Sequence, residues 1–525
     1  MLDFFVKFIF VMIEKHNFSL KKITPIIFLS LFCFLVNFSL GYGFRPFYAF
    51  LLMFLLLIIV NKCNFLYKAN IIFLLILSSA YFPIGLIYGP PSFNSVLSLY
   101  YTNKNESFEF IKSIPVYYFL SSILVIIIGF LNLKLPLKIE SKKIILFSYF
   151  IVFFGVFYNP IKIYVKSNNF DLLSIRFPPV RFFCEIYLSN QEVKKQYEEQ
   201  NRLLNLTDDW NPSRKTDNKY DTYIVVIGES VRKDMMNSYG FPLENTPFMS
   251  KANGILFNNY ISAASSTVLS LTNSFSLREN DNLKVNDNIV SLANKSGYFT
   301  YWFSNQGMLG IYDTSISAIG QKANYYFFSN KGEYNYVKLS DDILLPKVIN
   351  ALNDNIKKKI IFVHLIGSHA DHCERTNEKY DEFYLNKDMS CYIQSIKNTD
   401  LLLSKIADAA NKSNRKWSMM YFSDHGVSFY NEKLKDKRLT HSDKYKQNYQ
   451  VPFFITSYDS EYRSYINKFI SGFDFLSIYS EWIGVSEARI NSNCKYFSND
   501  ECDKEVKVID FNNNLKYYNS LPDEK

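Results

Sequence analysis

The sequence predicts a membrane domain of five helices followed by an α/β domain with a largely parallel sheet. Phe, Leu and Ile dominate residues 23–164, whereas charged and amide side chains become frequent after residue 165. From residue 222 onward, short apolar runs alternate with segments typical of helices or loops. With 525 residues and 48% hydrophobic content, the chain is long enough for both domains and too apolar for disorder. We place the membrane domain at residues 1–165, a linker at 166–217 and the α/β domain at 218–525.

Five apolar windows qualify as membrane-spanning helices, because a helix needs about 20 mostly apolar residues to cross a bilayer. These windows are residues 23–40, 47–65, 70–88, 115–135 and 144–163. A cleaved signal peptide fits less well, since the windows repeat and no small-residue cleavage pattern follows the first. Buried helices of a soluble core are the other alternative.

Lysines in the short loops predict the orientation, because basic residues are retained on the cytoplasmic side. They are Lys7, Lys15, Lys21 and Lys22 before the first window, Lys62 and Lys68 after the second, and Lys134, Lys138, Lys142 and Lys143 after the fourth. With five spans, the amino terminus is then cytoplasmic and the α/β domain is outside. In a bacterium this is an inner-membrane protein with a periplasmic domain.

Two segments outside the windows carry polar residues. In the outer loop, residues 89–110, Ser98, Thr102 and Glu106 recur every four residues, so a helix would place them on one face. This face is either solvated or turned toward lipid headgroups. The linker is rich in charges and amides, and we predict a helix within it near residues 191–204.

The cysteines fit an oxidising compartment. Two neighbouring sets, Cys373/Cys391 and Cys494/Cys502, allow two local disulfides and leave Cys184 over. A zinc ribbon is not favoured, since no Cys-x-x-Cys occurs. The formal net charge of +9 reflects the loop lysines and a Lys-rich α/β domain, so it does not predict nucleic-acid binding.

Four apolar runs of the α/β domain end in polar residues. YIVVIGES ends at Glu229 and Ser230, FTYWFSNQ at Ser304, Asn305 and Gln306, IIFVHLIGSH at Ser368 and His369, and SMMYFSDHG at Asp424, His425 and Gly426. Ligands bind at the carboxyl ends of strands in an open parallel sheet. The four runs therefore predict one site at one edge of the sheet.

The histidines favour a metal at this edge. Five of the six fall within the α/β domain, namely His364, His369, His372, His425 and His441. His364 lies inside a strand pattern, so we interpret it as a buried structural residue. Clustering of the others with Glu229 and Asp424 favours a metal, and oxygen and imidazole ligands suit zinc, with manganese as the second choice.

A hydroxyl-rich segment, residues 258–276, contains candidate nucleophiles. Its hydroxyls include Ser262, Ser265, Ser266, Thr267, Ser270 and Thr272. One interpretation is a helix amino terminus in which Ser265 or Ser266 is a cap. The other is a hydroxyl that a metal deprotonates and that attacks phosphorus or sulfur. Composition leaves open which hydroxyl that is.

These motifs resemble those of a known family. GES followed by VRKDMMNSYGFPLENTPFMSK, then SSTVLS, WFSNQ, HLIGSH, YIQSIKNTD and SDHG in this order, is similar to the phosphoethanolamine transferases of Gram-negative bacteria. The resemblance spans nearly the whole chain. It implies a five-helix anchor and a periplasmic α/β/α sandwich of the alkaline-phosphatase/sulfatase type.

The resemblance also implies roles for single residues. The implied zinc ligands are Glu229, Thr267, Asp424 and His425, with Thr267 also the nucleophile. His369 and His441 correspond to histidines that bind phosphate or a second zinc, Asn305 and Gln306 to substrate contacts, and Thr102 and Glu106 to the lipid-facing loop. The implied cycle moves phosphoethanolamine from phosphatidylethanolamine to Thr267 and then to an acceptor, so the partners are membrane lipids and a glycolipid or glycan.

Departures from the family pattern bear on the acceptor. Lipid A enzymes often carry cysteines near the positions of Ala263 and Asn273, and often Asn at the position of Ser98. These differences resemble the branch that acts on core sugars or periplasmic glucans, and lipopolysaccharide acceptors, whether core sugar or lipid A, stay open.

Three other functions fit the sequence less well than phosphoethanolamine transfer. A sulfatase requires Cys or Ser in a C/S-x-P-x-R frame, and SSTVLSL has neither the Pro nor the Arg. A glycerol-phosphate transferase shares the anchor and a threonine nucleophile, but its motifs match less well. A non-catalytic glycolipid-binding protein has no need of a metal-activated hydroxyl.

Overall fold

The computed structural model describes two compact units that divide after Lys194, within the predicted linker. The described residues are 20–93, 95–97, 114, 116–135, 137, 141–214, 219–279, 282–310, 313–332, 340–429, 438–490, 494–500 and 505–524. Ser98, Thr102, Glu106 and Cys502 lie outside them, so the polar face of the outer loop and the Cys494/Cys502 pairing stay predictions.

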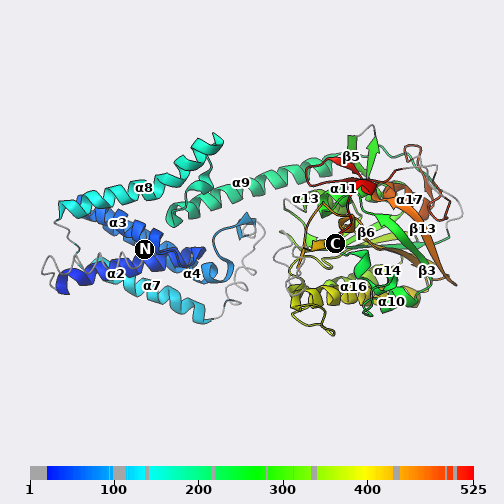
Figure 1. The fold of residues 1–525 in the computed structure, drawn as a ribbon, viewed down its shortest axis with the longest axis horizontal. Helices are drawn as coiled ribbons and strands as arrows, with labels where there is room; N and C mark the ends of the chain where they lie inside the picture. Colours follow the sequence, from blue (N-terminus) through cyan, green and yellow to red (C-terminus); the bar gives the residue numbers. More distant parts are fainter. Residues whose placement is uncertain are drawn as a thin grey trace. The chain divides into compact units, whose positions relative to one another are not determined.

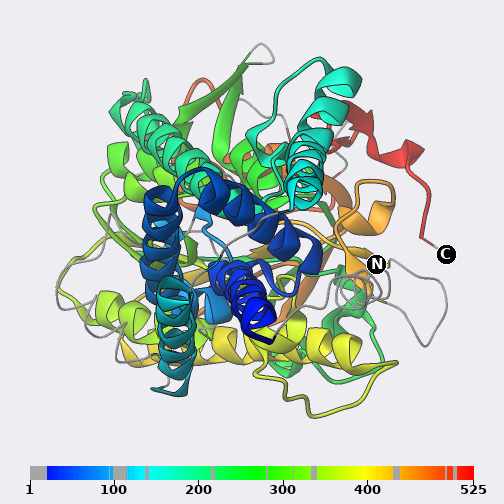
Figure 2. The same ribbon diagram turned by 90° about the vertical axis from the view of Figure 1, so that its left-hand side faces the viewer.

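The first unit consists of apolar helices (Figures 1 and 2). They are α2 (Leu20–Asn37), continued by η1 (Phe38–Tyr42), α3 (Pro46–Lys62), α4 (Asn64–Tyr88), α7 (Val116–Lys134) and α8 (Lys142–Ser167). Within the described residues, four segments are long and apolar enough to cross a membrane: Thr24–Tyr42, Asn64–Ile87, Val116–Lys134 and Lys142–Ser167. These four correspond to four of the five predicted windows.

The remaining window, residues 47–65, corresponds to α3, which is apolar but has 17 residues. The helix ends early because Cys63 is extended, and α4 begins at the next residue. Lys68 therefore lies inside α4 and not in a loop as predicted. By length and composition, four described segments qualify to cross a membrane, and the predicted count of five is not confirmed.

The linker contains one long helix, α9 (Pro178–Asn205), preceded by the short η2 (Leu172–Ser174). It starts at a proline, whose missing N–H costs nothing in the first turn of a helix. The helix is therefore longer than the predicted one at residues 191–204.

The second unit is built on an eight-stranded sheet with the order β13-β3-β12-β9-β2-β8-β6-β7. The strands are β2 (Thr222–Gly228), β3 (Gly254–Ile261), β6 (Phe299–Gly307), β7 (Tyr325–Asn330), β8 (Lys359–His364), β9 (Trp417–Ser423), β12 (Phe453–Ser457) and β13 (Arg463–Ser471). All neighbouring pairs are parallel except the two that β12 makes with β3 and β9. The prediction of a largely parallel sheet is confirmed.

Helices cover both faces of this sheet (Figure 1). One layer contains α10 (Pro247–Lys251), α14 (Leu345–Asn353) and α16 (Lys387–Lys412), and the other contains α11 (Thr267–Phe275), α12 (Ile289–Lys295), α13 (Thr314–Gln321) and α17 (Phe475–Trp482). In β2, Tyr223, Val225 and Ile227 enter one core, whereas Ile224 and Val226 enter the other. A strand buried on both faces reads as a continuous apolar run, which explains YIVVI.

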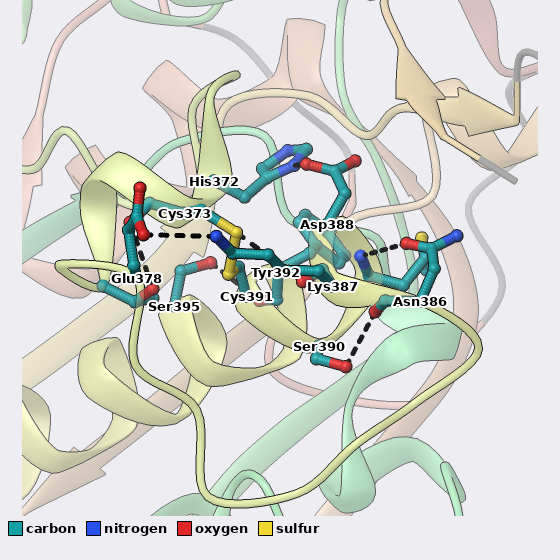
Figure 3. The surroundings of a disulfide bond; sticks show 12 residues. His372, Cys373, Glu378, Asn386, Lys387, Asp388, Ser390, Cys391, Tyr392 and Ser395 are labelled. Carbon is teal, nitrogen blue, oxygen red and sulfur yellow. Dashed lines mark hydrogen bonds and ion pairs between the residues drawn. A yellow bond between two sulfur atoms is a disulfide. The ribbon is translucent and has the colours of Figure 1, made fainter. Parts of the chain in front are cut away.

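A disulfide joins Cys373 and Cys391 (Figure 3), which is one of the two local disulfides that the sequence allows. It links α15 (His372–Arg375) to the first turns of α16. Next to it, His372 Nδ1 lies 3.2 Å from Asp388 Oδ1. The bridge therefore restrains the segment that leaves β8.

Removing this bridge is expected to destabilise the second unit. The chain-entropy model gives about 3 kcal/mol for a loop of this size, so Cys373→Ala/Cys391→Ala should lower the free energy of unfolding by about that amount. Denaturant unfolding measures the change, with Cys184→Ala as the control because Cys184 is a free thiol. An equal effect of both variants would contradict a specific role of the bridge.

Candidate active site

The four predicted strand ends meet at one edge of the sheet. In the parallel registers, Gly228 of β2 lies opposite Ser423 of β9, and Ile227 lies opposite His364 of β8. Ser304 of β6 also lies opposite His364. The residues that follow these positions therefore emerge side by side, which confirms the single edge predicted from the sequence.

A sharp turn after β2 directs Glu229 into this edge. A Cβ on Gly228 would lie 2.9 Å from the Tyr421 hydroxyl, so glycine allows the close approach of the two strands. Ser230 then has φ of 60°, the left-handed region that few L residues adopt. Its hydroxyl donates to Glu229 Oε1 at 2.7 Å, and its N–H donates to Asp424 Oδ1 at 3.0 Å. One turn thus orients two carboxylates.

Gly367 packs directly against this turn. Its φ is +50°, and a Cβ there would lie 3.0 Å from Glu229 N. Gly367→Ala is expected to cost about 1–2 kcal/mol from the left-handed backbone and a further 1–3 kcal/mol from overpacking. Thermal unfolding compares it with Gly297→Ala, which has φ of +80° but no heavy atom within 4 Å of the added Cβ. A Gly367→Ala loss no larger than the Gly297→Ala loss would contradict the close contact.

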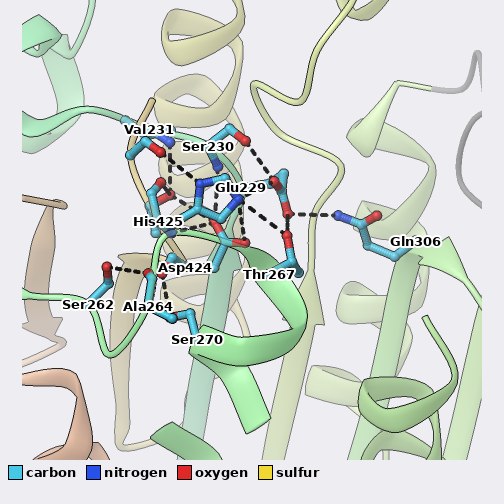
Figure 4. A network of polar contacts seen from close by, with 12 residues as sticks. Glu229, Ser230, Val231, Ser262, Ala264, Thr267, Ser270, Gln306, Asp424 and His425 are labelled. Carbon is cyan, nitrogen blue, oxygen red and sulfur yellow. Dashed lines mark hydrogen bonds and ion pairs between the residues drawn. The ribbon is translucent and has the colours of Figure 1, made fainter. Parts of the chain in front are cut away.

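Glu229, Asp424 and His425 form a compact buried cluster (Figure 4). One ligand atom from each lies within 4.8 Å of the others. His425 Nε2 is 3.3 Å from Glu229 Oε1 and 3.5 Å from Asp424 Oδ2. Two oxygen ligands and one imidazole are a donor set that suits zinc.

The hydrogen bonds of the cluster leave the ligand atoms available. His425 Nδ1 lies 2.8 Å from the Gly426 carbonyl, so this nitrogen is a donor and Nε2 is the ring nitrogen that faces the two carboxylates. Asp424 Oδ1 accepts from the N–H groups of Ser230 and His425, whereas Oδ2 is buried without a hydrogen-bond partner. A buried carboxylate oxygen without a hydrogen-bond partner is suited to be a ligand of a metal cation.

The charges of the cluster also favour a bound cation. Burial opposes ionisation of Glu229, but its hydrogen bond to His425 and the charge of that ring hold its pKa below the usual value. Burial and the neighbouring Glu229 raise the pKa of Asp424. Burial disfavours the charged form of His425, yet the two carboxylates raise its pKa to about 9. The two neighbouring carboxylates thus favour a positive charge beside them. Without a metal, this charge is the extra proton of His425, and a metal ion would supply the charge and release the proton.

Thr267 begins α11 and contacts the cluster. Its hydroxyl donates to Glu229 Oε2 at 3.1 Å and lies 3.4 Å from His425 Nε2. Ser266 is the N-cap residue but makes no side-chain cap hydrogen bond. Thr267 is therefore the hydroxyl of residues 258–276 that the structure brings to the carboxylates, at a helix end that favours anions.

A cavity of about 500 Å³ opens beside Thr267. His369, His441 and Gln306 line it, and Gln306 Nε2 also lies 3.3 Å from Glu229 Oε2. The His441 ring centre is 5.0 Å from that of His425 and 5.9 Å from that of His369. Burial lowers the pKa of His369 to about 4 and of His441 to about 3, with nearby positive charge adding to both shifts. Both rings are therefore neutral at pH 7.

Other predicted residues lie elsewhere. Asn305 donates to Asp341 Oδ1 at 2.8 Å, and Asp341 accepts from the N–H groups of Ile366 and Gly367. Asn305 thus supports the loop against Glu229 and is not among the described residues that line the cavity. His372, which we grouped with the candidate ligands, pairs with Asp388 instead.

Two cavity residues were missed by the sequence reading. His364, interpreted as structural, lines the cavity with its Nε2 buried and without a hydrogen-bond partner. Asp313 also lines the cavity, although it precedes a helix and follows no apolar run. In the sequence, the signal for His364 was its position as the last residue of an apolar run. No sequence pattern marks Asp313.

Comparisons with known proteins agree with this architecture. Residues 221–485, half of the chain, match the sulfatase family model. The chain is 34% identical to phosphoethanolamine transferase OpgE of Escherichia coli K12 over 88% of its own length and 89% of that protein. It is 33% identical to a putative phosphoethanolamine transferase of Haemophilus influenzae over 67% of this chain and 72% of that protein.

Among solved structures, the C-terminal periplasmic domain of Escherichia coli EptC in complex with Zn superposes with a TM-score of 0.50 at 21% identity. That match covers 60% of this chain and 96% of the EptC domain, and it shows a common fold. The chain therefore belongs to the phosphoethanolamine transferases of the sulfatase family.

Proposed function

We propose that this protein transfers phosphoethanolamine from phosphatidylethanolamine to a glycolipid or glycan through a phospho-threonine intermediate on Thr267. The observation that carries the proposal is the Thr267 hydroxyl, which donates to Glu229 and lies beside His425 at the wall of the cavity. The relationship to OpgE supports the transferred group.

The first step joins the Thr267 oxygen to the phosphorus. The bond from phosphorus to the diacylglycerol oxygen breaks, and the hydroxyl proton passes to that leaving oxygen. Glu229 orients the nucleophile through its hydrogen bond, and Gln306 fixes the same carboxylate oxygen. In the second step, the oxygen of an acceptor hydroxyl joins the same phosphorus. The bond from phosphorus to the Thr267 oxygen breaks, and the acceptor proton passes to that oxygen, which restores the free Thr267 hydroxyl.

Glu229, Thr267, Asp424 and His425 would hold a zinc ion. The Zn complex of the related EptC domain and the buried Asp424 oxygen support this assignment. When bound, zinc would lower the pKa of the hydroxyl and stabilise charge on the phosphoryl oxygens. His369 and His441 would bind the phosphoryl group or a second zinc, and their neutral rings close to His425 support this role.

The location we propose is the bacterial inner membrane, with a cytoplasmic amino terminus and a periplasmic catalytic domain. Lysines at or near the ends of the apolar helices support the orientation, and the Cys373–Cys391 disulfide supports an oxidising compartment. A lipid donor explains why a catalytic domain is attached to membrane-spanning helices.

Mass spectrometry of the cell envelope tests the proposal and finds the acceptor. Lipid A, core oligosaccharide and periplasmic glucans are compared in cells with the wild type, with Thr267→Ala or without the protein. We expect one fraction to gain a phosphoethanolamine unit in the wild type alone. A gain of phosphoglycerol would favour the glycerol-phosphate alternative, and no gain in any fraction would favour a binding role.

A further inference from the structure

We propose that the aromatic ring of Phe511 stacks against a sugar ring of the acceptor at the mouth of the catalytic cavity. This inference rests on the proposed function and concerns its second step, in which an acceptor hydroxyl takes phosphoethanolamine from Thr267. It assigns that hydroxyl to a saccharide and names the side chain that holds the saccharide in place.

Phe511 belongs to the cavity and is also open to solvent. It lines the same cavity as Thr267 and His441, yet 45% of the residue is exposed. Such exposure places Phe511 at the opening of the cavity, whereas the carboxylates and His425 are buried. After the first step, the phosphoryl group is bound to Thr267 inside the cavity, so the body of the acceptor must lie at the opening. Phe511 is therefore placed to contact the acceptor.

A hairpin near the carboxyl terminus carries Phe511. Its strands are β15 (Lys507–Ile509) and β16 (Leu515–Tyr517), which pair antiparallel, and Phe511 lies in the turn between them. The last residue of β15 donates its N–H to the Ala263 carbonyl at 2.8 Å. Ala263 precedes Thr267 by four residues, so the hairpin is attached to the segment that leads into the nucleophile.

A second hydrogen bond attaches Phe511 to the opposite side of the site. Its N–H donates to Asp443 Oδ2 at 3.0 Å, and Asp443 follows His441 by two residues. The backbone of Phe511 is thus fixed to the segments that carry both Thr267 and His441. The place of its side chain at the opening is therefore set by the fold.

The chemistry of this turn fits a saccharide. Asp510 Oδ1 accepts from the N–H groups of Asn512 and Asn514 at 3.0 and 2.8 Å, which orders the turn, and Asn512 and Asn513 are exposed beside Phe511. The face of an aromatic ring is electron-rich and attracts the C–H groups of a sugar ring, and amide side chains hydrogen-bond to sugar hydroxyls. A hydrocarbon chain would leave these amides without partners. The turn therefore favours a sugar over the acyl chains of a lipid.

Separate measurement of the two steps tests the inference with the full-length chain in detergent. Incubation with phosphatidylethanolamine alone gives the rate at which the phosphoethanolamine adduct forms on Thr267. Addition of core oligosaccharide, periplasmic glucans or lipid A then gives kcat/KM for each acceptor, which reports the second step of a two-step transfer. We expect Phe511→Ala to lower kcat/KM for the saccharide acceptor by about 10-fold or more, because an aromatic contact and its buried area are lost. The rate of adduct formation should not fall with it.

Two further variants separate stacking from damage to the hairpin. Phe511→Trp should keep most of the kcat/KM, because it keeps an aromatic face. Tyr517→Ala is the matched control, since Tyr517 is an exposed aromatic residue of β16 and is not among the described residues that line the cavity. An equal loss in Phe511→Trp or in Tyr517→Ala would overturn the role of Phe511. So would an unchanged kcat/KM in Phe511→Ala, or an equal fall in its rate of adduct formation.

The wild type tests the substrate class by itself. Transfer to a sugar hydroxyl of one fraction is the expected result. An adduct on Thr267 that passes to no fraction, or only to a phosphate group of lipid A, would overturn the saccharide assignment and leave the first step of the proposed function standing. The absence of any adduct would overturn the proposed function as well.

Discussion

Thr267→Ala is expected to reduce phosphoethanolamine transfer by about 10⁴-fold or more. The variant removes the oxygen that would form the covalent intermediate, and nucleophiles of this kind contribute effects of that order. Of the hydroxyls in residues 258–276, Thr267 is the one that contacts Glu229 and His425. Diacylglycerol release from phosphatidylethanolamine, measured at saturating lipid, gives the change in kcat.

The matched control is Thr272→Ala on the same helix. Thr272 is buried, its hydroxyl has no hydrogen-bond partner, and it does not line the cavity among the described residues. Thr272→Ala should change kcat by no more than about 3-fold. A buried hydroxyl without a hydrogen-bond partner contributes little to stability, so the helix that carries Thr267 should keep its structure. Comparable losses in both variants would indicate damage to α11 and not loss of a nucleophile.

Asp424→Asn is expected to lower the affinity for zinc by about 10²-fold or more and to abolish transfer with it. The asparagine oxygen can still accept from Ser230 N and His425 N, as Asp424 Oδ1 does. The substitution therefore changes chiefly the buried Oδ2, which has no hydrogen-bond partner, and removes its charge. A lost ligand should exceed the 10–100-fold effects of residues that only orient ligands.

Metal analysis of the purified protein after dialysis against a weak chelator measures this change. Asp408→Asn serves as the control, since Asp408 is an exposed carboxylate on α16 of the same unit. Retention of one zinc per chain by Asp424→Asn would contradict the proposed ligand set. A fall in zinc content without a fall in transfer activity would show that the reaction does not require the metal.

The position of the site was predictable because two simple patterns coincide. Apolar runs such as YIVVI identify strands buried on both faces, and polar residues such as Glu229 and Asp424 mark where those strands end. Parallel registers then force these ends together. Composition did not distinguish Thr267 from neighbouring hydroxyls, because that choice depends on how α11 meets β2 across the fold. The resemblance to the transferases supplied it.

Other features depended on contacts that the sequence does not encode locally. His364 lies at the end of β8, where one side chain either enters a core or faces the cavity, and the alternation of the strand does not decide between them. Asn305 bonds to Asp341 from a distant segment, and its role in substrate contact stays a prediction. The helix α3 is short because Cys63 is extended, which no hydropathy window registers.

Mass spectrometry of the protein itself tests the central claim most directly. The wild type and Thr267→Ala are incubated with phosphatidylethanolamine in detergent without any acceptor, quenched and digested. We predict that the peptide containing Thr267 gains the mass of one phosphoethanolamine group in the wild type and that no peptide of the variant gains it. The same mass on another residue of the wild type, or on the variant, would contradict Thr267 as the nucleophile.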